Sequence, residues 1–162
     1  MVALECPLPD EDATLALGAA MAMHLEAGLV IFLRGELGAG KTTLVRGVLR
    51  GLDYTGRVKS PTYTLVELYA VSRLDLHHFD FYRFQDPREW IDAGFRETFN
   101  GRNVSLIEWP EKAGGLLPAP DVELVLTSSG SGRNASLRAS SPGGVRFLER
   151  LRPTFPFTFR NT

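Results

Sequence analysis

The sequence predicts an α/β fold: a single domain with a mixed, mostly parallel central sheet flanked by helices. An apolar run, 29–33, lacks the alternation of a strand with one wet face, so we expect it to be covered on both faces, as in a parallel sheet. Helical periodicity flanks this run, over 12–26 and 43–50. The length of 162 residues, 44% of them hydrophobic, suits one domain with a core and is too short for two of ordinary size.

A complete phosphate-binding loop follows the apolar run directly. Residues 35–42 read G-E-L-G-A-G-K-T and match the pattern G-x-x-x-x-G-K-[ST]. The glycines let successive backbone N–H groups converge on phosphate oxygens, Lys41 adds a cation near the β and γ phosphates, and the Thr42 hydroxyl can ligate Mg2+. A strand before the loop and a helix after it are the context that the motif requires. The sequence therefore predicts a single-domain P-loop NTPase.

The first half of the chain supplies helices and antiparallel strands around the loop. Asp10 and Asp12 offer an acidic N-terminal cap to the helix over 12–26, and Gly51 ends the helix after the loop. Strands are predicted over 62–71 and 74–80. Because only two residues join them, they must be antiparallel, which puts antiparallel strands at the edges of the sheet. A capping box at 86–89 then predicts a short helix that ends at Gly94.

The second half predicts one more core strand and a peripheral layer. A strand is expected over 104–108, a helical turn or loop over 110–117, an exposed hairpin from 122–127 and 135–139, and a final helix over 145–151. We assign the P-loop domain to 1–152. Alternating phenylalanines in the tail, 153–162, fit either an edge strand or a disordered end.

Composition limits the binding partners and the cellular compartment that we expect for this chain. The net charge of -1 at pH 7 gives no general attraction to DNA, RNA or anionic membranes, so any RNA contact must be local or made through a partner. Cys6 is the only cysteine, which excludes an internal disulfide and a cysteine-cluster metal site and fits a cytoplasmic setting. The N-terminus does not read as a leader, and no apolar stretch approaches the roughly 20 residues of a membrane span, so we expect no membrane association.

Two acidic residues end apolar strands where a metal would be held. Asp80 closes 76–79 and Glu108 closes 104–107. Ligands gather beyond the carboxyl ends of parallel strands, so both side chains are candidates to fix Mg2+ and its waters. Surface acids at turns are the alternative interpretation. The sequence leaves open which of the two touches Mg2+ directly and which acts through water.

Three further features are ambiguous by sequence. The segment 60–64 lies where many NTPases sense the γ phosphate, yet a polar turn before a strand would look the same. His77 and His78 are adjacent in a strand and so point to opposite faces, which favours packing or partner contact over a metal pair. Trp109 fits a lid over the nucleotide, an exposed anchor for another protein, or core packing.

Four segments together resemble the TsaE (YjeE) family of bacterial ATPases: the loop 35–43, S-P-T-Y-T-L-V-E at 60–67, H-F-D-F-Y-R at 78–83 and L-I-E-W-P at 106–110. The resemblance runs from about Thr14 to Pro118 and thins toward the C-terminus. It implies an ATP- and Mg2+-dependent ATPase of the machinery that makes threonylcarbamoyl-adenosine in tRNA. Such a protein acts with the TsaD and TsaB proteins and meets tRNA only through their complex.

The resemblance also implies roles for individual residues. Lys41, Asp80 and Glu108 are expected to be catalytic, and Thr42, Asp80 and Glu108 to serve the metal. Thr62 falls in the switch-like segment, and Arg133 is a weaker match to a nucleotide contact. The residues expected to bind the nucleotide are Glu36, Leu37, Gly38, Ala39, Gly40, Lys41, Thr42, Thr43, Thr62, Trp109 and Arg133.

Other functions compete with this one. A small-molecule P-loop kinase needs an acceptor pocket and usually an arginine-bearing lid, a part that Arg83 or Arg88 would have to play. A GTPase is disfavoured because none of the three lysines lies in the Asn/Thr-Lys-x-Asp segment that reads guanine. A binding module that uses ATP only to lock its shape is the remaining alternative.

Overall fold

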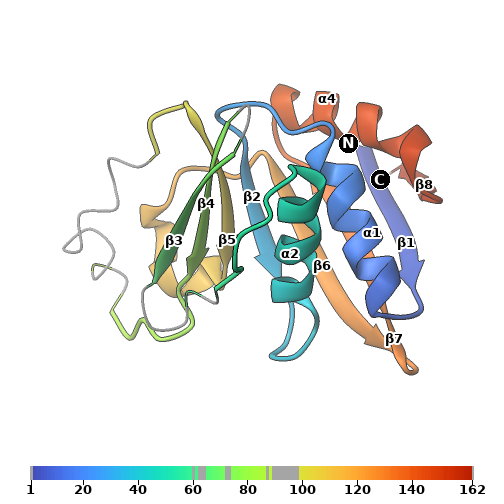
Figure 1. The fold of residues 1–162 in the computed structure, drawn as a ribbon, viewed down its shortest axis with the longest axis horizontal. Helices are drawn as coiled ribbons and strands as arrows, with labels where there is room; N and C mark the ends of the chain where they lie inside the picture. The colour runs from blue at the N-terminus through green and yellow to red at the C-terminus, as the bar shows by residue number, and fades with distance from the viewer. Residues whose placement is uncertain are drawn as a thin grey trace.

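The computed structural model describes residues 2–59, 61, 65–71, 74–86, 88 and 99–161. Figure 1 shows a single twisted sheet with α1 and α2 side by side on one face. The sheet has eight strands in the order β3-β4-β5-β2-β6-β7-β1-β8. Within the described residues, no helix is long and apolar enough to cross a membrane. The elements are β1 Val2–Leu8, α1 Glu11–Ala22, β2 Val30–Arg34, α2 Lys41–Gly51, β3 Val66–Ala70, β4 Asp75–Asp80, β5 Asn103–Glu108, η2 Pro110–Leu116, β6 Val122–Ser129, β7 Gly132–Ala139, α4 Pro142–Leu151, η3 Arg152–Thr154 and β8 Thr158–Asn161.

Four parallel strands form the centre of the sheet. β2 pairs in parallel with β5 on one side and with β6 on the other, and β4 extends the parallel set beyond β5. The remaining pairings, of β3 with β4, β6 with β7, and β1 with β7 and β8, are antiparallel. The predicted fold class is thus confirmed, with parallel strands in the middle and antiparallel strands at the edges. β2 is buried along nearly its whole length, as its unbroken apolar run predicted.

The helices on the front face pack unusually close together. α1 and α2 lie side by side (Figure 1), and a Cβ added at Gly18 of α1 would lie 2.7 Å from the Val48 nitrogen of α2. A Cβ at Gly47 of α2 would lie 2.9 Å from the Leu15 Cα. Since real Cβ atoms essentially never approach other atoms so closely, glycine is required at both positions. The close packing holds the N-terminal ends of both helices at the same edge of the sheet.

The core consists of two apolar clusters, one on each face. The larger lies on the helix side and includes the buried residues of α1, α2 and α4 together with Ile31, Leu33 and Leu106. The smaller lies on the opposite face of the central strands and includes Phe32, Phe79 and the η2 residue Ala113, among others. The two clusters cover both faces of the central strands. The polar side chains of the site lie at the carboxyl ends of these strands.

Several predicted boundaries and one arrangement differ from the structure. The first helix ends at Ala22 rather than at Glu26, and the last begins earlier, at Pro142, because the Ser141 side chain caps it. The predicted hairpin of β6 and β7 is confirmed, and buried residues alternate with more exposed ones along β6, but the sequence did not show that β6 lies next to β2 inside the sheet.

Two terminal strands complete one side of the sheet. β1 was not predicted, and it lies between β7 and β8 with Leu4, Cys6 and Leu8 buried. The C-terminal segment, for which an edge strand and a disordered end were both open, forms β8 against β1. The predicted helix over 86–94 and the residues Thr62, Ser72 and Arg73 lie outside the described part of the chain, apart from Asp86 and Arg88.

Candidate functional site

The phosphate loop leaves β2 and enters α2 in the conformation its glycines allow. Gly38 and Gly40 have φ values of 79° and 102°, a region that other residues rarely adopt. The first helical hydrogen bond is donated by the Leu44 N–H to the Gly40 carbonyl, at 2.9 Å. The N–H groups of Lys41, Thr42 and Thr43 therefore have no partner within the helix and are available to an anion bound by the loop. This is the usual anion site of a helix N-terminus.

Lys41 is nearly buried at the base of the loop, with 5% of its surface exposed. Its ammonium group donates to the carbonyls of Gly35 and Glu36, the latter at 3.3 Å. The Trp109 ring covers it, with its centroid 4.3 Å from the Lys41 Nζ. Burial lowers the pKa of Lys41, and the charges of Glu108 and Asp80 oppose that change. The cation thus contacts the loop and the Trp109 ring and lines the same pocket as the two acids.

Asp80 and Glu108 end neighbouring parallel strands and face each other in the register of β4 and β5. Both are buried, with 8% and 4% of their surfaces exposed. Burial raises the pKa of Asp80; the Tyr82 N–H, which donates to Asp80 Oδ1 at 3.0 Å, lowers it, and the Glu108 charge raises it again. The two acids are therefore neither surface residues nor remote from the loop. Together with Lys41 and Thr42 they line a pocket of about 350 Å3.

Trp109 forms one wall of this pocket, at the start of η2. It adopts left-handed backbone angles, φ 56° and ψ 49°, that let the chain turn directly after Glu108. Its ring centroid lies 5.0 Å from that of Tyr82, and its side chain is half-buried against the smaller apolar cluster. Arg34 forms a partly exposed ion pair with Glu111 of η2, at 3.7 Å, and a second one with Glu123, at 3.0 Å. Trp109 thus packs on the core while its ring borders the site.

Two histidines on β4 have different surroundings. The Nε2 atom of His78 lies 2.5 Å from Glu108 Oε2, and the His78 side chain is fully buried. His77 lies on the other face of the strand, against the Phe79 ring. The expectation that they do not form a metal pair agrees with this geometry, but the contact between His78 and Glu108 was missed. A sequence signal existed, because His78 is two residues before Asp80 and so must share its face of the sheet.

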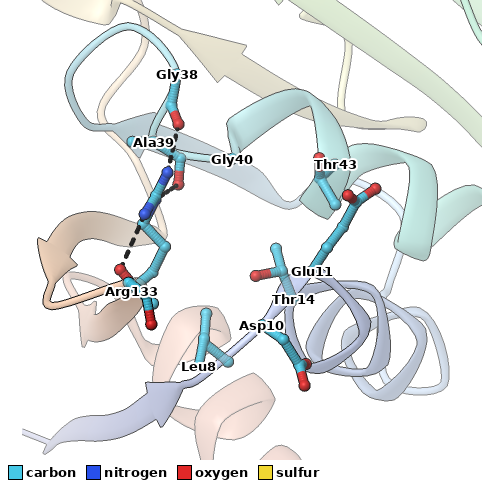
Figure 2. Close-up of a pocket in the computed structure, with 11 residues that line it drawn as sticks. Leu8, Asp10, Glu11, Thr14, Gly38, Ala39, Gly40, Thr43 and Arg133 are labelled. Carbon is cyan, nitrogen blue, oxygen red and sulfur yellow. Dashed lines mark hydrogen bonds between the residues drawn. The ribbon is translucent and has the colours of Figure 1, made fainter.

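A second pocket, of about 300 Å3, lies on the other side of the loop. Figure 2 shows Arg133 of β7 reaching the loop, where Nη2 donates to the Gly38 carbonyl at 2.9 Å and Nε to the Ala39 carbonyl at 3.1 Å. Thr43 of α2 and the first turn of α1 line the rest of this pocket. Sequence reasoning missed the contributions of Leu8, Asp10, Glu11 and Thr14, because they depend on how β1 and α1 pack beside the loop.

The predicted site residues fall into three groups. Ten of them come together and line the pocket of about 350 Å3: Lys41, Thr42, Thr43, Leu37, Gly38, Ala39, Gly40, Asp80, Glu108 and Trp109. Two others lie outside this pocket: Arg133 donates to the loop from β7, and Glu36, itself a loop residue, accepts from Lys41 through its backbone carbonyl. Thr62 lies outside the described residues.

The donor set fits Mg2+ better than a transition metal. Within the described ranges, no group of three or more His, Cys, Asp or Glu side chains is arranged to hold a metal ion by itself. Mg2+ characteristically takes one or two carboxylates and completes its shell with water and phosphate oxygens. Two buried carboxylates beside a phosphate loop and the Thr42 hydroxyl match that requirement.

Both the sequence and the fold have known counterparts. A family model described as "Threonylcarbamoyl adenosine biosynthesis protein TsaE" matches residues 8–135. The chain belongs to the TsaE family. The matched region includes Arg133 and extends beyond the span of about 14–118 over which the sequence motifs carried the resemblance.

Individual TsaE proteins and one crystal structure agree with this membership. The TsaE protein of Haemophilus influenzae is 42% identical over 146 residues, which are 87% of this chain and 92% of that protein. The TsaE protein of Bacillus subtilis is 38% identical over 122 residues, 75% of each chain. Both are named as tRNA threonylcarbamoyladenosine biosynthesis proteins. The crystal structure of Bacillus subtilis YdiB superposes with a TM-score of 0.82 at 29% identity, covering 95% of this chain and 97% of YdiB.

Proposed function

We propose that this chain binds and hydrolyses Mg2+–ATP in support of threonylcarbamoyladenosine formation in tRNA. The observation that carries the proposal is the convergence of Lys41, Asp80 and Glu108 beside a complete phosphate loop, in one pocket of about 350 Å3. TsaE family membership supports the pathway. The pocket supports the chemistry, because it combines a cation for phosphate oxygens with carboxylates suited to a divalent metal.

The nucleotide is proposed to occupy two of the pockets that border the loop, those of about 350 and 300 Å3. They share Gly38, Ala39, Gly40 and Thr43, so one molecule can extend from one to the other. The phosphates belong with Lys41 and the first-turn N–H groups, and the nucleoside with the smaller pocket. Arg133 borders that pocket and donates hydrogen bonds to two carbonyls of the loop. It would therefore affect nucleotide binding partly by stabilising the conformation of the loop.

Each residue has a defined task in this proposal. Thr42, Asp80 and Glu108 would hold Mg2+, which when bound neutralises charge on the phosphate oxygens. Lys41 would exchange its bonds to the Gly35 and Glu36 carbonyls for bonds to phosphate oxygens. Trp109 covers Lys41 and would limit access of water to the phosphates from that side. We keep Thr62 as a candidate γ-phosphate contact.

ATP hydrolysis by this chain is proposed to change its complex with other proteins rather than to transfer phosphate to a metabolite. We infer that the chain works with TsaD and TsaB in the cytoplasm and meets tRNA only through their complex. A third pocket, of about 380 Å3 and lined by Gly35, Glu36, Ala39 and Trp109 among others, also borders the loop. TsaE family membership, rather than a lack of space for a phosphate acceptor, therefore favours the ATPase over a small-molecule kinase.

Turnover measurements test the proposal directly. Purified chain is incubated with ATP and Mg2+, alone and with TsaD and TsaB, and both phosphate release and phosphorylated products are measured. We expect slow release alone, an increase with the partners and no turnover in EDTA. Lys41→Ala should abolish turnover, and Lys59→Ala, an exposed lysine outside both pockets, should not. Phosphate transfer to a nucleoside or metabolite, or failure to associate with TsaD and TsaB under any nucleotide condition, would contradict the proposal.

A further inference from the structure

The Glu108 carboxylate forms a hydrogen bond with the side chain of His78. Among the residues that the structure describes, this is its only hydrogen bond to a side chain. The Nε2 atom of His78 lies 2.5 Å from Glu108 Oε2; the His78 side chain is fully buried, and that of Glu108 is 5% exposed, toward the pocket that it lines. In the register of β4 and β5, His78 pairs with Leu106 and is therefore diagonal to Glu108 on the same face of the sheet. The contact is built by two central strands rather than by a loop, so its geometry is rigid.

The surroundings of His78 indicate how the proton is arranged. Its other ring nitrogen, Nδ1, is buried with no hydrogen-bond partner among the described residues. An N–H at this position would be a buried donor without an acceptor, which costs more than an unpaired acceptor nitrogen. The geometry therefore places a hydrogen on Nε2, which donates it to Glu108 Oε2.

We propose that His78 is a positioning residue for Glu108, which it orients for Mg2+ binding. The inference rests on the proposed function of the site. Because His78 occupies Oε2, the carboxylate is held in one rotamer, and Oε1 remains as the oxygen for the metal or for one of its waters. Hydrogen bonds of this kind to metal-ligating groups orient them, and their loss typically costs 10- to 100-fold in metal affinity or activity.

The position of Glu108 explains why it needs such a partner. Asp80 is directly opposite it in the neighbouring strand, and the two carboxylates repel each other where burial weakens screening by water. A glutamate has three rotatable side-chain bonds, so without a donor it can turn away from Asp80 and from the pocket. The hydrogen bond from His78, on the same face of the sheet, restricts these rotations.

Three variants separate positioning from packing. His78→Phe keeps a ring of similar size and removes the donor. His78→Gln places an amide nitrogen near the position of Nε2 and restores it. His77→Phe is the matched control, because it makes the same change at the adjacent residue, whose side chain lies on the other face of β4. Thermal unfolding of each variant establishes that it is folded.

Two readouts are needed, one of which does not involve turnover. Binding of Mn2+ in the presence of a non-hydrolysable ATP analogue is measured by calorimetry, and ATP turnover is measured across Mg2+ concentrations with TsaD and TsaB present. We expect His78→Phe to weaken Mn2+ binding and lower kcat by about 10- to 100-fold while the KM for ATP changes little. His78→Gln should recover most of this loss, and His77→Phe should behave as wild type.

A double variant decides whether the effect passes through Glu108. If His78 acts by orienting this carboxylate, adding His78→Phe to Glu108→Gln should cost nothing further in either readout. An equal loss in the presence and absence of Glu108→Gln, or wild-type Mn2+ binding by His78→Phe, would overturn the inference while leaving the proposed function intact. If the wild-type chain with nucleotide binds no Mn2+ and shows no Mg2+-dependent turnover, the proposed function fails, and the role of His78 fails with it.

Discussion

Adding one methyl group at Gly47 should force the two front helices apart. Gly47 is in the middle of α2, and a Cβ placed there would lie 2.9 Å from the Leu15 Cα and 3.0 Å from its carbonyl carbon, with the carbonyl oxygen closer still. Ordinary contacts of a Cβ begin at 3.4 Å, so α1 and α2 must separate by at least about 0.5 Å. The neighbouring atoms belong to the backbone and cannot rotate away.

Two opposing terms set the size of the effect. Alanine favours the helical conformation over glycine by roughly 1 kcal/mol, which acts to stabilise the variant. Overpacking of a closely packed contact costs about 1–3 kcal/mol, and a clash with backbone belongs at the upper end of that range. We therefore expect Gly47→Ala to lower the free energy of unfolding by roughly 2 kcal/mol. For a domain of this size that corresponds to a fall in Tm of about 4–8 °C.

Urea and thermal unfolding followed by circular dichroism measure this change. Gly143→Ala is the matched control, because Gly143 is also helical and a Cβ there meets its nearest atoms at 3.6 to 3.9 Å, which is ordinary contact. It should be neutral or stabilising by up to about 1 kcal/mol. If Gly47→Ala proves as stable as the wild type, the helices do not pack as closely as described, and the account of how α1 is held beside the loop is wrong.

Three other variants test separate features. Asp121→Ala should lower the free energy of unfolding by about 2 kcal/mol, because the Val30 N–H loses the carboxylate that accepts from it at 2.8 Å; urea unfolding should show Asp121→Asn intermediate. Arg133→Ala should weaken nucleotide binding about 10-fold in calorimetry by removing its bonds to the loop carbonyls, whereas the exposed Arg138→Ala should not; equal affinities would exclude that role. Burial raises the pKa of Cys6 from 9.0 to about 11, so the folded state holds this proton more tightly than the unfolded state. That stabilisation is complete below pH 9 and should be lost as pH rises toward 11, by up to about 1.4 kcal/mol per pH unit, and urea unfolding of Cys6→Ala should lack this part of the slope.

Local patterns predicted most elements because their causes are local. The apolar run of β2 and the glycines of the loop require only the residues themselves, so a strand, a turn and a helix were expected where they are found. β1 was missed because it becomes a strand by pairing with β7 and β8, both near the other end of the chain. The interior position of β6 likewise depends on its pairing with β2, about 90 residues away, and local alternation does not report such a partner.

The candidate site shows the same division. The loop residues are consecutive, and Asp80 and Glu108 each end an apolar strand, so the acids were found by position alone. His78 could have been added by counting two residues back from Asp80, but its contact with Glu108 also requires that β4 and β5 be neighbours in parallel. The contribution of Thr14 had no local signal at all. It borders the second pocket because α1 packs against α2 through glycines.

The sequence by itself determined that this protein has a phosphate loop, two strand-ending acids and the motifs of the TsaE family. Each of these is set by residue type and spacing over short stretches of chain. Only the tertiary structure decided which strands are adjacent, that Lys41, the two acids and Trp109 line one pocket, and that Arg133 contacts the loop from β7. The physical reason is that strand order and helix packing arise from burial of apolar surface shared by distant segments, and that information is distributed over the whole chain.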